Sequence, residues 1–597
     1  MPRPGWPISP LMDGIYAMST EVLDPPAQAS AAGSTDKFAA KVNPPSPVEV
    51  IKKASRGLRG SLVESLADPL TGAIRDSDTQ LIKFHGSYMQ DDRDMRAERE
   101  HQKLEPAYSF MIRTRTPGGV VSPKQWLALS ALARTYGTGS LRLTTRQAFQ
   151  LHGVIKKDLK KTMQGMNAVL IDSIAACGDV NRNVMAAANP VESRVHQEVY
   201  DWSVKLSEHL KPKTRAYHEI WLDGEKLVGE PEHEPILGQL YLPRKFKTAV
   251  VVPPHNDVDI FSQDLGFIAI LEPDSTGENQ LVGFNLTVAG GLGATHGEPQ
   301  TFPRVGDVIG FLTPDQMLKV AENVVMIQRD FGDRTDRKHA RFKYTVADRG
   351  VEWFKAELFK RLGYALPPPR EYKFTTQGDR FGWTQGFDGR WHLTLRIESG
   401  RVVDAPGRPF LTGLEKIAAI HQGDFRLTAN QNLIIANVPA SECMNIDKLV
   451  ADHGLGKALF TSPVRRDALA CVSLPSCGLA MAEAERYLPT FVDRVDELLI
   501  KHGLKDIPLT VRITGCPNGC ARPYLAEIAL IGRAPGRYTL RLGADAVGSR
   551  LNVLYRDNID EPSIVNALDE LIARYAAERN KDERFGDFLW RVGVLKN

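Results

Sequence analysis

Four of the chain's six cysteines stand in two short clusters. Cys471 and Cys477 enclose five residues, and Cys516 and Cys520 enclose three. Four thiolates are the ligand set of a cubane iron–sulfur cluster. Zinc is the alternative, but zinc sites usually draw paired ligands from CxxC-type knuckles, which neither spacing matches. The cysteines therefore predict a [4Fe–4S] cluster that ties two separate segments of the fold together.

The other two cysteines, Cys177 and Cys443, occur in unrelated contexts, and we interpret them as structural thiols. Disulfides are disfavoured because no secretory signal is visible. No apolar run reaches the roughly 18 residues that span a bilayer. The segment 1–50 is rich in Pro, Ala and Ser and predicts a disordered leader, with Met18 as an alternative start. We expect a cytoplasmic protein.

The composition is that of an ordinary globular protein and does not indicate a particular function. The 597 residues suffice for several domains, and 42% hydrophobic with 25% charged residues is ordinary for a globular chain. The formal net charge of +3 gives no reason to expect a nucleic-acid or membrane partner.

An internal repeat organises the middle of the chain. Leu141–Gly153 recurs 284 positions later as Phe425–Asn437, with Arg-Leu-Thr-x-x-Gln in common and alternating apolar residues that suit a strand. A predicted strand and a predicted helix precede each copy: Phe110–Arg115 with Pro123–Tyr136, and Trp391–Ile397 with Leu411–His421. A duplicated β-α-β unit predicts two half-domains related by a pseudo-twofold axis.

The two copies differ in their polar residues. The first carries Arg146 and His152 where the second has Asn430 and Ala436. A site built on the first half would leave this asymmetry, and drift in an unimportant strand is the alternative.

Further elements are predicted around the repeats. Helices are expected at Val191–Leu210 and Thr313–Arg329, and strands at Tyr217–Leu222, Thr248–Pro253 and Phe267–Ile270. A last helix, Leu479–Ile500, interrupted near Pro489 and ended by Gly503, would follow Cys477 directly. Its N-terminal dipole would then face the cluster.

Although the total charge is nearly balanced, Arg and Lys concentrate in five segments: Arg113–Arg115, Arg142 with Arg146, Asn181–Asn183, Arg244–Lys247 and Asp333–Lys343. Lys245 and Lys247 share one face of a predicted strand, where two cations repel unless an anion lies between them. Solvated surface charge is the alternative for any one segment. Nucleic acid is a competing ligand, but no recognised binding motif accompanies the segments. Together they favour an anionic ligand or cofactor.

At these residues the chain resembles the siroheme-containing sulfite and nitrite reductase superfamily, most closely its assimilatory NADPH-dependent sulfite reductase hemoprotein (beta) subunits. The resemblance covers about residue 55 to Asn597. It is carried by the cysteine spacings, the duplicated Arg-Leu-Thr strand and three further segments: Gln90–Arg99, Tyr241–Thr248 and Thr514–Cys520.

The resemblance implies siroheme, an iron tetrahydroporphyrin with eight carboxylates, joined to a [4Fe–4S] cluster through one shared cysteine sulfur. The implied cluster ligands are Cys471, Cys477, Cys516 and Cys520, with Cys520 shared. The implied siroheme contacts are Arg142, Thr144, Arg146, Gln150, His152, Arg244, Asn518 and Cys520, although a neutral core role for His152 is an equal alternative. Arg113, Arg182, Lys245 and Lys247 would bind sulfite and donate protons during its six-electron reduction to sulfide.

The implied fold class is α+β (mixed α/β), a three-domain siroheme reductase with a duplicated ferredoxin-like half-domain. The predicted divisions are a leader at 1–50, an N-terminal arm and first half-repeat at 51–175, a central α/β domain at 176–380, a second half-repeat at 381–456 and a C-terminal iron–sulfur and siroheme domain at 457–597.

Electrons must come from a separate donor, because no flavin or NADPH fingerprint occurs. The turn Gly290–Gly293 does not complete GxGxxG. The resemblance favours a flavoprotein with FAD and FMN, with the leader as a docking segment, and ferredoxin is the alternative. Two other functions stay open, nitrite reduction to ammonia and mere anion binding or sensing. The complete set of four cysteines, two arginines and two lysines argues against the second.

Overall fold

The computed structural model describes residues 43–188, 194–224 and 233–596. Pro45–Asn597 forms one compact unit, and Met1–Pro44 is a separate unit, nearly all of which lies outside the described residues. The predicted leader therefore lies largely outside the described residues, although helix α1 (Pro47–Ala54) begins within its predicted range. None of the described helices is long and apolar enough to cross a membrane.

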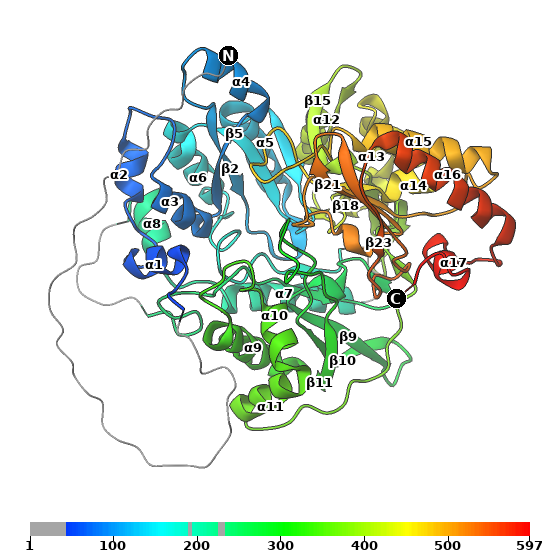
Figure 1. The fold of residues 1–597 in the computed structure, drawn as a ribbon, viewed down its shortest axis with the longest axis horizontal. Coiled ribbons are helices and arrows are strands. Elements are labelled where there is room, and N and C mark those ends of the chain that lie inside the picture. Colours follow the sequence, from blue (N-terminus) through cyan, green and yellow to red (C-terminus); the bar gives the residue numbers. More distant parts are fainter. Residues whose placement is uncertain (1–42, 189–193, 225–232, 597) are drawn as a thin grey trace, which may run out of the picture. The chain divides into compact units, whose positions relative to one another are not determined.

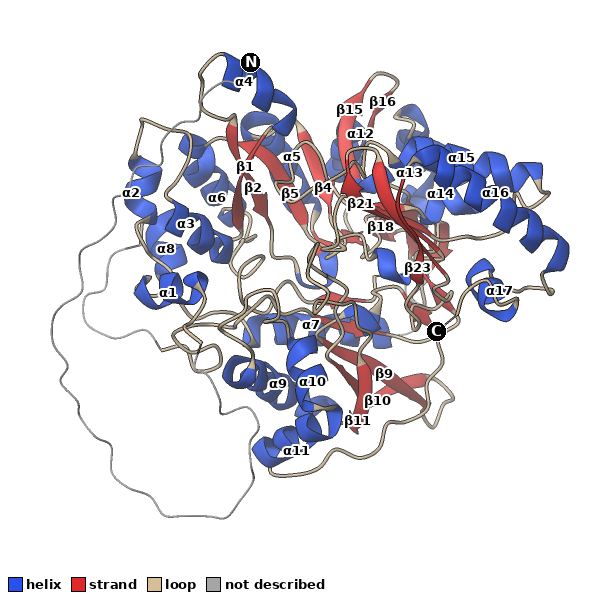
Figure 2. Ribbon diagram, viewed as in Figure 1, coloured by secondary structure: helices blue, strands red, loops and turns tan. Residues whose placement is uncertain are grey.

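The two repeats form two sheets, and each sheet includes a strand from the other repeat. Figures 1 and 2 show β15 of the second repeat beside the strands of the first sheet. The first sheet has the order β1 (Ser87–Asp91), β2 (Tyr108–Arg113), β5 (Phe149–Val154), β4 (Ser140–Leu143), β15 (Arg401–Ala405) and β16 (Arg408–Pro409). The second has the order β13 (Gly382–Gln385), β14 (Trp391–Leu395), β18 (Leu433–Val438), β17 (Asp424–Leu427) and β3 (Val120–Val121).

The exchange of strands is reciprocal. In the first sheet, β15 of the second repeat pairs with β4, with Val402 opposite Leu141. In the second sheet, β3 of the first repeat pairs with β17, with Val121 opposite Phe425. The predicted pseudo-twofold relation is therefore present in the strand order itself.

Equivalent helices of the two repeats, α5 (Pro123–Tyr136) and α12 (Phe410–Ile420), pack against one another. Helix α5 begins as predicted, because Ser122 and Gln125 form a capping box and Pro123 occupies its first turn. The Trp126 ring of α5 stacks on Phe425 of the other half, with the ring centroids 4.9 Å apart. Both helix predictions are confirmed to within one residue.

The repeated motif is a hairpin rather than a single strand, which corrects the sequence-based interpretation. In the first copy, Thr144 closes a tight turn between β4 and β5, and Gln147 takes a left-handed φ of 51°. In the second copy, Thr428 and Gln431, with a φ of 67°, do the same between β17 and β18. The Thr and Gln that recur in both copies of the repeat are therefore turn residues.

The central region has a five-stranded sheet covered by helices. Its order is β11 (Asp307–Leu312), β10 (Asn279–Val288), β9 (Leu265–Pro273), β7 (Thr248–Val251) and β6 (Met185–Ala186). The main helices are α7 (Val195–His209), α9 (Met317–Phe331), α10 (Phe342–Arg349) and α11 (Val351–Leu362). The strand predicted at Tyr217–Leu222 is wrong: helix α8 (Ala216–Trp221) lies there, with Tyr217 and Trp221 buried in the core.

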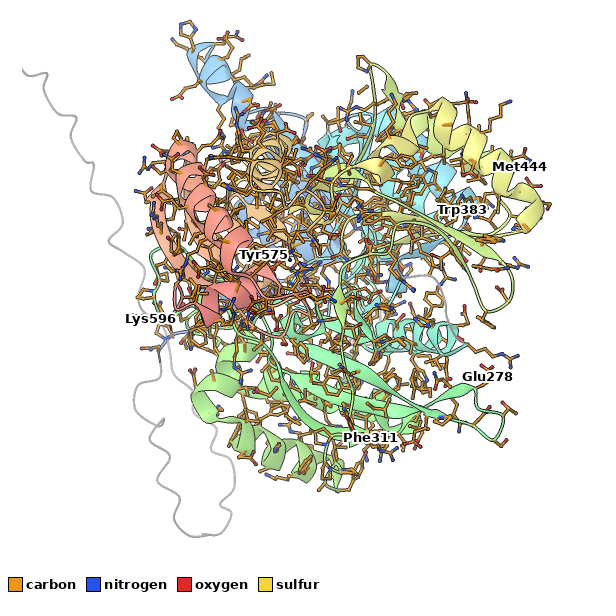
Figure 3. All side chains as sticks on the ribbon, turned by 90° about the vertical axis from the view of Figure 1, so that its right-hand side faces the viewer. Glu278, Phe311, Trp383, Met444, Tyr575 and Lys596 are labelled. Atoms are coloured by element: carbon orange, nitrogen blue, oxygen red, sulfur yellow. The ribbon has the colours of Figure 1, made fainter. Side chains whose placement is uncertain are left out.

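The C-terminal region has its own sheet and hydrophobic core. The sheet order is β19 (Leu469–Ala470), β20 (Val511–Thr514), β21 (Ile528–Ala534), β22 (Arg537–Leu542) and β23 (Val553–Ile559). Helices α15 (Leu488–Lys501), α16 (Glu561–Glu578) and α17 (Phe585–Arg591) supply apolar residues to this core. Tyr575 of α16, which is labelled in Figure 3, lies in this region. Its ring packs against Phe585 and Phe588 of α17.

Helix α15 begins at Leu488, so the helix predicted at Leu479–Ile500 starts too early. Pro489 lies in the first turn of α15, where the missing N–H costs nothing, rather than interrupting the helix. Cys477 therefore does not lead directly into a helix. The prediction that a helix dipole faces the cluster at this point is wrong. Gly503 follows the C-terminal end of α15 with a φ of 71°, as predicted.

The remaining described helices and short strands surround these sheets: α2 (Leu62–Ala67), α3 (Asp76–Leu81), α4 (Arg96–His101), α6 (Leu159–Asn167), α13 (Cys443–Asp452), α14 (Pro463–Asp467), β8 (His255–Asn256) and β12 (Thr376–Gln377).

Candidate active site

The four clustered cysteines lie at one edge of the C-terminal sheet. Strands β19 and β20 are parallel, with Ala470 opposite Ile513. Cys471 follows β19 at once, and the Cys516–Cys520 loop follows β20, so parallel pairing brings both cysteine segments to the same strand ends. The Gly515 N–H donates to Cys471 Sγ at 3.4 Å.

The thiols act on one another electrostatically. Burial and then Cys520, with contributions from Cys516 and Cys477, raise the pKa of Cys471. Burial and Cys520 raise the pKa of Cys516 to about 11. All four are free thiols. Thiolates gathered without a cation are unfavourable, and a bound metal centre removes that cost by replacing the protons.

The four thiols do not form a ready-made site for a single metal ion. In the part of the chain that the structure describes, no three His, Cys, Asp or Glu side chains stand close enough to hold a single metal ion. A four-iron cubane binds each thiolate through a different iron and so spaces its ligands more widely than one ion does. The donor set, four thiols and no imidazole, fits such a cluster.

Lys245 and Lys247 form the centre of a basic face. They flank Phe246, whose backbone bridges to Asn181, so the two lysines share a side of an extended segment. Neither ammonium has a hydrogen-bond or ion-pair partner among the described residues. Both are half-buried, and the charge on Cys520 acts on both.

Burial and crowding by cations weaken the hold of both lysines on their protons. Burial, together with nearby Arg244 and Arg341, lowers the pKa of Lys245 well below its usual value. Burial, together with Arg341 and Arg146, lowers the pKa of Lys247 to about 7. Arg244 is affected in the same way, since burial and Arg337 lower its pKa to about 10. An anion bound here would relieve the repulsion.

Arg113 and Arg182 adjoin this face. Arg113 ends β2, and its Nη1 donates to Cys177 Sγ at 3.1 Å. Arg182 is buried, and its Nε donates to the Gly178 carbonyl at 2.8 Å. The Arg113 guanidinium lies 6.0 Å from the centre of the Tyr88 ring, and Arg182 hydrogen-bonds the Tyr88 side chain. The structure therefore brings the predicted substrate arginines together around Tyr88.

Sequence reasoning did not single out Tyr88. Cys177, interpreted as a structural thiol, is buried, as that interpretation expects, and it also lies against Arg113 and contributes to the electrostatic surroundings of Tyr88. Tyr88 stands two residues before Gln90–Arg99, one of the segments used for the resemblance, so its neighbourhood carried a signal. The only sequence signal for Cys177 was its position, four residues before the segment Asn181–Asn183.

The first-repeat turn supplies the next group of predicted residues. Arg146 donates to the Gln263 side chain at 2.8 Å and to the Thr248 carbonyl at 3.1 Å. Its Nε is buried without a partner, and burial and Arg182 lower its pKa to about 9. The Thr144 hydroxyl accepts from the Arg146 and Ala148 N–H groups, so it first of all holds the turn. An orphaned guanidinium N–H fits a carboxylated ligand.

Gln150 and His152 form a buried pair beside Arg113. Gln150 lies opposite Arg113 in the β2–β5 pairing. With its amide oriented to satisfy both neighbours, its oxygen accepts from Arg113 Nε at 3.1 Å and its nitrogen donates to His152 Nε2 at 3.2 Å. Burial and the nearby arginines lower the pKa of His152 well below its usual value, so the ring is neutral. A neutral ring suits both a core role and a cofactor contact, so the role of His152 stays a prediction.

Arg142 and Asn518 lie on the cysteine side. Arg142 is buried and pairs with Glu485, which Arg401 also binds at 2.8 Å. Its charge is therefore compensated within the protein, and Cys471 is among the charges that act on it. Asn518 Nδ2 lies 3.7 Å from Cys516 Sγ, within the cysteine loop.

The cations of the fifth basic segment, Asp333–Lys343, are bonded within the protein, although the Nε of Arg341 is buried without a partner. Each of its cations has a protein partner: Arg334 with Glu49, Arg337 with Asp179, Lys338 with Glu298, Arg341 with Asp264, and Lys343 with three backbone carbonyls. Arg341 also acts on the basic face electrostatically, since its charge lowers the pKa of both Lys245 and Lys247.

Comparison with protein families gives two matches. The "Nitrite and sulphite reductase 4Fe-4S domain" matches residues 201–366, which contain none of the six cysteines. The "Nitrite/Sulfite reductase ferredoxin-like half domain" matches twice, at residues 101–169 and 385–453. The double match confirms the predicted duplication of a ferredoxin-like half-domain.

Curated relatives match over nearly the full length. A "Sulfite reductase [NADPH] hemoprotein beta-component" of Myxococcus xanthus is 64% identical, covering 92% of this chain and 97% of the relative. Proteins of that name from Anoxybacillus flavithermus and Xanthomonas campestris are 57% and 58% identical, covering 93% and 92% of this chain and 96% of each relative. A solved structure of the Mycobacterium tuberculosis NirA protein has the same fold, with a TM-score of 0.74 at 22% identity, over 92% of this chain and 97% of that one.

Proposed function

Because the chain belongs to the sulfite reductase [NADPH] hemoprotein beta-component family, we propose that it reduces sulfite to sulfide at a siroheme coupled to a [4Fe–4S] cluster. One observation carries the proposal. Two half-buried ammonium groups, Lys245 and Lys247, have no protein partner among the described residues and lie within electrostatic reach of Cys520. Uncompensated cations at such a place favour a small dianion.

The residues present fit both groups. Cys471, Cys477, Cys516 and Cys520 would hold the cluster, and Cys520 would be shared with the siroheme iron. Arg146, with its orphaned Nε, and Arg244 would bind carboxylates of the macrocycle. Thr144, Gln150, His152, Asn518 and the compensated Arg142 would contact it through neutral or already paired groups. When bound, the two groups supply the electrons one at a time.

The chain's own side chains would hold the substrate and deliver protons. Arg113 and Arg182 present fixed guanidinium groups that can bind two oxygens of sulfite, since Arg113 is anchored on β2 and Arg182 on Gly178. Lys245 and Lys247 neutralise the rest of the dianion. A lysine with a pKa of about 7, as at Lys247, can give up and regain a proton at neutral pH, which suits a general acid.

The electron donor would be a separate flavoprotein subunit, because the names of the relatives specify NADPH while no dinucleotide turn occurs in this chain. Ferredoxin is the alternative donor. Nucleic acid and membrane have no place in this function, and we infer that the protein works in the cytoplasm. The five-part domain division remains a prediction.

Cofactor content is the first test. Purified protein should contain about four cluster irons and one siroheme iron per chain, with the visible absorption of siroheme. Elemental analysis and an optical spectrum decide this. Stoichiometric zinc without a visible chromophore would contradict the proposal.

Turnover is the second test. With reduced methyl viologen, the purified chain should turn over sulfite with a higher kcat/KM than nitrite, and it should not oxidise NADPH alone. Adding a cognate flavoprotein should give NADPH-dependent sulfide production. A preference for nitrite would favour nitrite reductase, the second candidate, and no turnover of either anion would favour a binding or sensing role.

A further inference from the structure

Arg522, two residues after Cys520, has a buried side chain that holds four acceptors at once. Its Nη1 donates to the Thr145 carbonyl at 3.1 Å and to the Ala429 carbonyl at 2.8 Å. Its Nη2 donates to Asn430 Oδ1 at 2.7 Å, and its Nε donates to the Asp259 carboxylate. Four of the five guanidinium N–H donors are therefore bonded to protein acceptors, which holds the side chain in one place.

Two of these acceptors are equivalent positions of the internal repeat. Thr145 and Ala429 are 284 positions apart, and each lies in the hairpin turn of its own half. One guanidinium nitrogen thus contacts both turns, and the loop that carries Arg522 is fixed relative to both halves. A lysine could reach one of the acceptors but could not bind all four, because its ammonium lacks the planar fork.

The carboxylate of Asp259, which accepts from Arg522, is itself held by a second arginine. Asp259 is buried, and it also accepts from Arg512 Nη1 at 2.8 Å. The same Arg512 nitrogen donates to the Arg522 carbonyl at 3.1 Å. The two arginines lower the pKa of Asp259 in spite of its burial, so the carboxylate stays charged and the network stays paired.

The loop between Cys520 and Arg522 is short and internally bonded. The Arg522 N–H donates to the Gly519 carbonyl at 2.9 Å, and the Thr145 hydroxyl donates to the Cys520 carbonyl at 2.9 Å. Arg522 has a left-handed φ of 53°, which the surrounding bonds hold in place. A shift of the Arg522 side chain would therefore move the Cys520 backbone.

We propose that Arg522 is a positioning residue that sets the location of Cys520, and that the second repeat acts as its fixed support through Ala429 and Asn430. This inference rests on the proposed role of Cys520 as the ligand shared by cluster and siroheme. Asn430 stands where the first repeat has Arg146, yet no cofactor contact is proposed for the second repeat. The second repeat would thus contribute to the site indirectly, because its turn fixes the position of the loop that carries Cys520.

The test compares Arg522→Lys and Asn430→Ala with a matched control, Arg584→Lys. Arg584 also binds a buried carboxylate of the C-terminal region, Glu527, through two nitrogens, but within the described residues it makes no hydrogen bond or ion pair with either hairpin turn. All three holoproteins are characterised by iron and siroheme content, Mössbauer spectra and the midpoint potential of the siroheme, alongside sulfite turnover.

Arg522→Lys should keep its iron and siroheme but lose magnetic coupling between the two centres in a measurable fraction of molecules, with turnover about tenfold lower. Asn430→Ala should show the same change to a smaller extent, and Arg584→Lys should keep the wild-type spectra even where its Tm falls. If Arg522→Lys fails to bind the cofactors, the Mössbauer spectrum and siroheme potential of Asn430→Ala test the inference instead.

Wild-type coupling and potential in both Arg522→Lys and Asn430→Ala would overturn the inference while leaving the proposed function intact. Absence of coupled centres from the wild-type protein would instead refute the proposed function itself. Equal spectral changes in Arg584→Lys would also overturn the inference, because they would assign the effect to general destabilisation.

Discussion

The Thr145 hydroxyl donates a hydrogen bond to the backbone carbonyl of Cys520 at 2.9 Å, across a sequence separation of 375 residues. Thr145 stands between Thr144 and Arg146 in the first-repeat turn, and Cys520 is the last of the clustered cysteines. The residues proposed to hold the macrocycle and those proposed to hold the cluster are therefore joined directly through backbone and side chain.

The first prediction separates two cysteines. Cys471→Ser and Cys520→Ser each remove one thiolate from the cluster, but Cys520 alone is proposed to be shared with siroheme. In Cys520→Ser, the two centres should be uncoupled even where both are retained, whereas Cys471→Ser should impair the cluster itself. Mössbauer spectra and iron analysis distinguish the two variants. Unchanged spin coupling in Cys520→Ser would refute the bridging role.

The second prediction concerns the unpaired lysines. Lys245→Ala and Lys247→Ala each remove a cation from a site for a dianion, and each should cost about 2–4 kcal/mol of transition-state stabilisation in kcat/KM for sulfite. Lys338→Ala is the matched control, because Lys338 belongs to a basic segment but is exposed and paired with Glu298. Full sulfite turnover in both active-site variants would show that the substrate face is assigned wrongly.

The third prediction uses the pKa of Lys247, which burial and neighbouring cations lower to about 7. As the pH rises through 7, the ammonium loses its proton, so sulfite binding should weaken more steeply in the wild type than in Lys247→Arg, whose charge persists. Sulfite itself titrates in this range, so the difference between the two proteins is the quantity to measure, by optical titration between pH 6 and 8.5. Parallel binding curves would exclude a titrating Lys247.

The fourth prediction concerns stability. His85 is buried and neutral, with Nδ1 accepting from Trp221 at 3.3 Å and Nε2 donating to the Leu58 carbonyl at 3.1 Å. Burial lowers its pKa from 6.5 to about 4. Between these values the unfolded chain binds a proton that the folded chain refuses, so the free energy of unfolding should fall by roughly 3 kcal/mol as the pH drops from 6.5 to 4.

Chemical denaturation of wild type and His85→Asn across that range measures the effect. The variant is less stable at neutral pH but should lack this part of the pH dependence. Substituting the exposed His101 by Asn provides the control, and equal pH slopes in wild type and His85→Asn would count against the assignment.

The fifth prediction concerns the leader, which lies largely outside the described residues. Deleting Met1–Pro45 leaves the Ser46 N–H bonded to the Arg334 carbonyl at 2.9 Å, so the folded unit should be preserved. The deletion should weaken NADPH-dependent activity with the flavoprotein while sparing the viologen assay. Equal coupled rates with and without the leader would assign docking to the folded surface.

Local chemistry made part of the structure predictable from sequence. Cysteine spacing located the thiol cluster, and the capping residues Ser122 and Gln125 located α5. The helix α8 was mistaken for a strand because Tyr217–Leu222 is rich in aromatic and β-branched residues, whose preference the tertiary packing overrides. The pairing of Arg337 with Asp179 joins residues 158 positions apart, and no local pattern reports such a partner.

Because β15 of the second repeat pairs with β4, and β3 of the first repeat pairs with β17, neither ferredoxin-like half contains all the strands of its own sheet. The partner strand lies 261 positions away in the pairing of Val402 with Leu141 and 304 positions away in that of Phe425 with Val121, so a half expressed alone would lack part of its backbone partners. Such long-range pairing makes assembly slow and highly cooperative, because the entropy of closing long loops is lost before the contacts form. Duplication here has produced mutual dependence, and a truncated half exposes the edge strand that its partner normally covers.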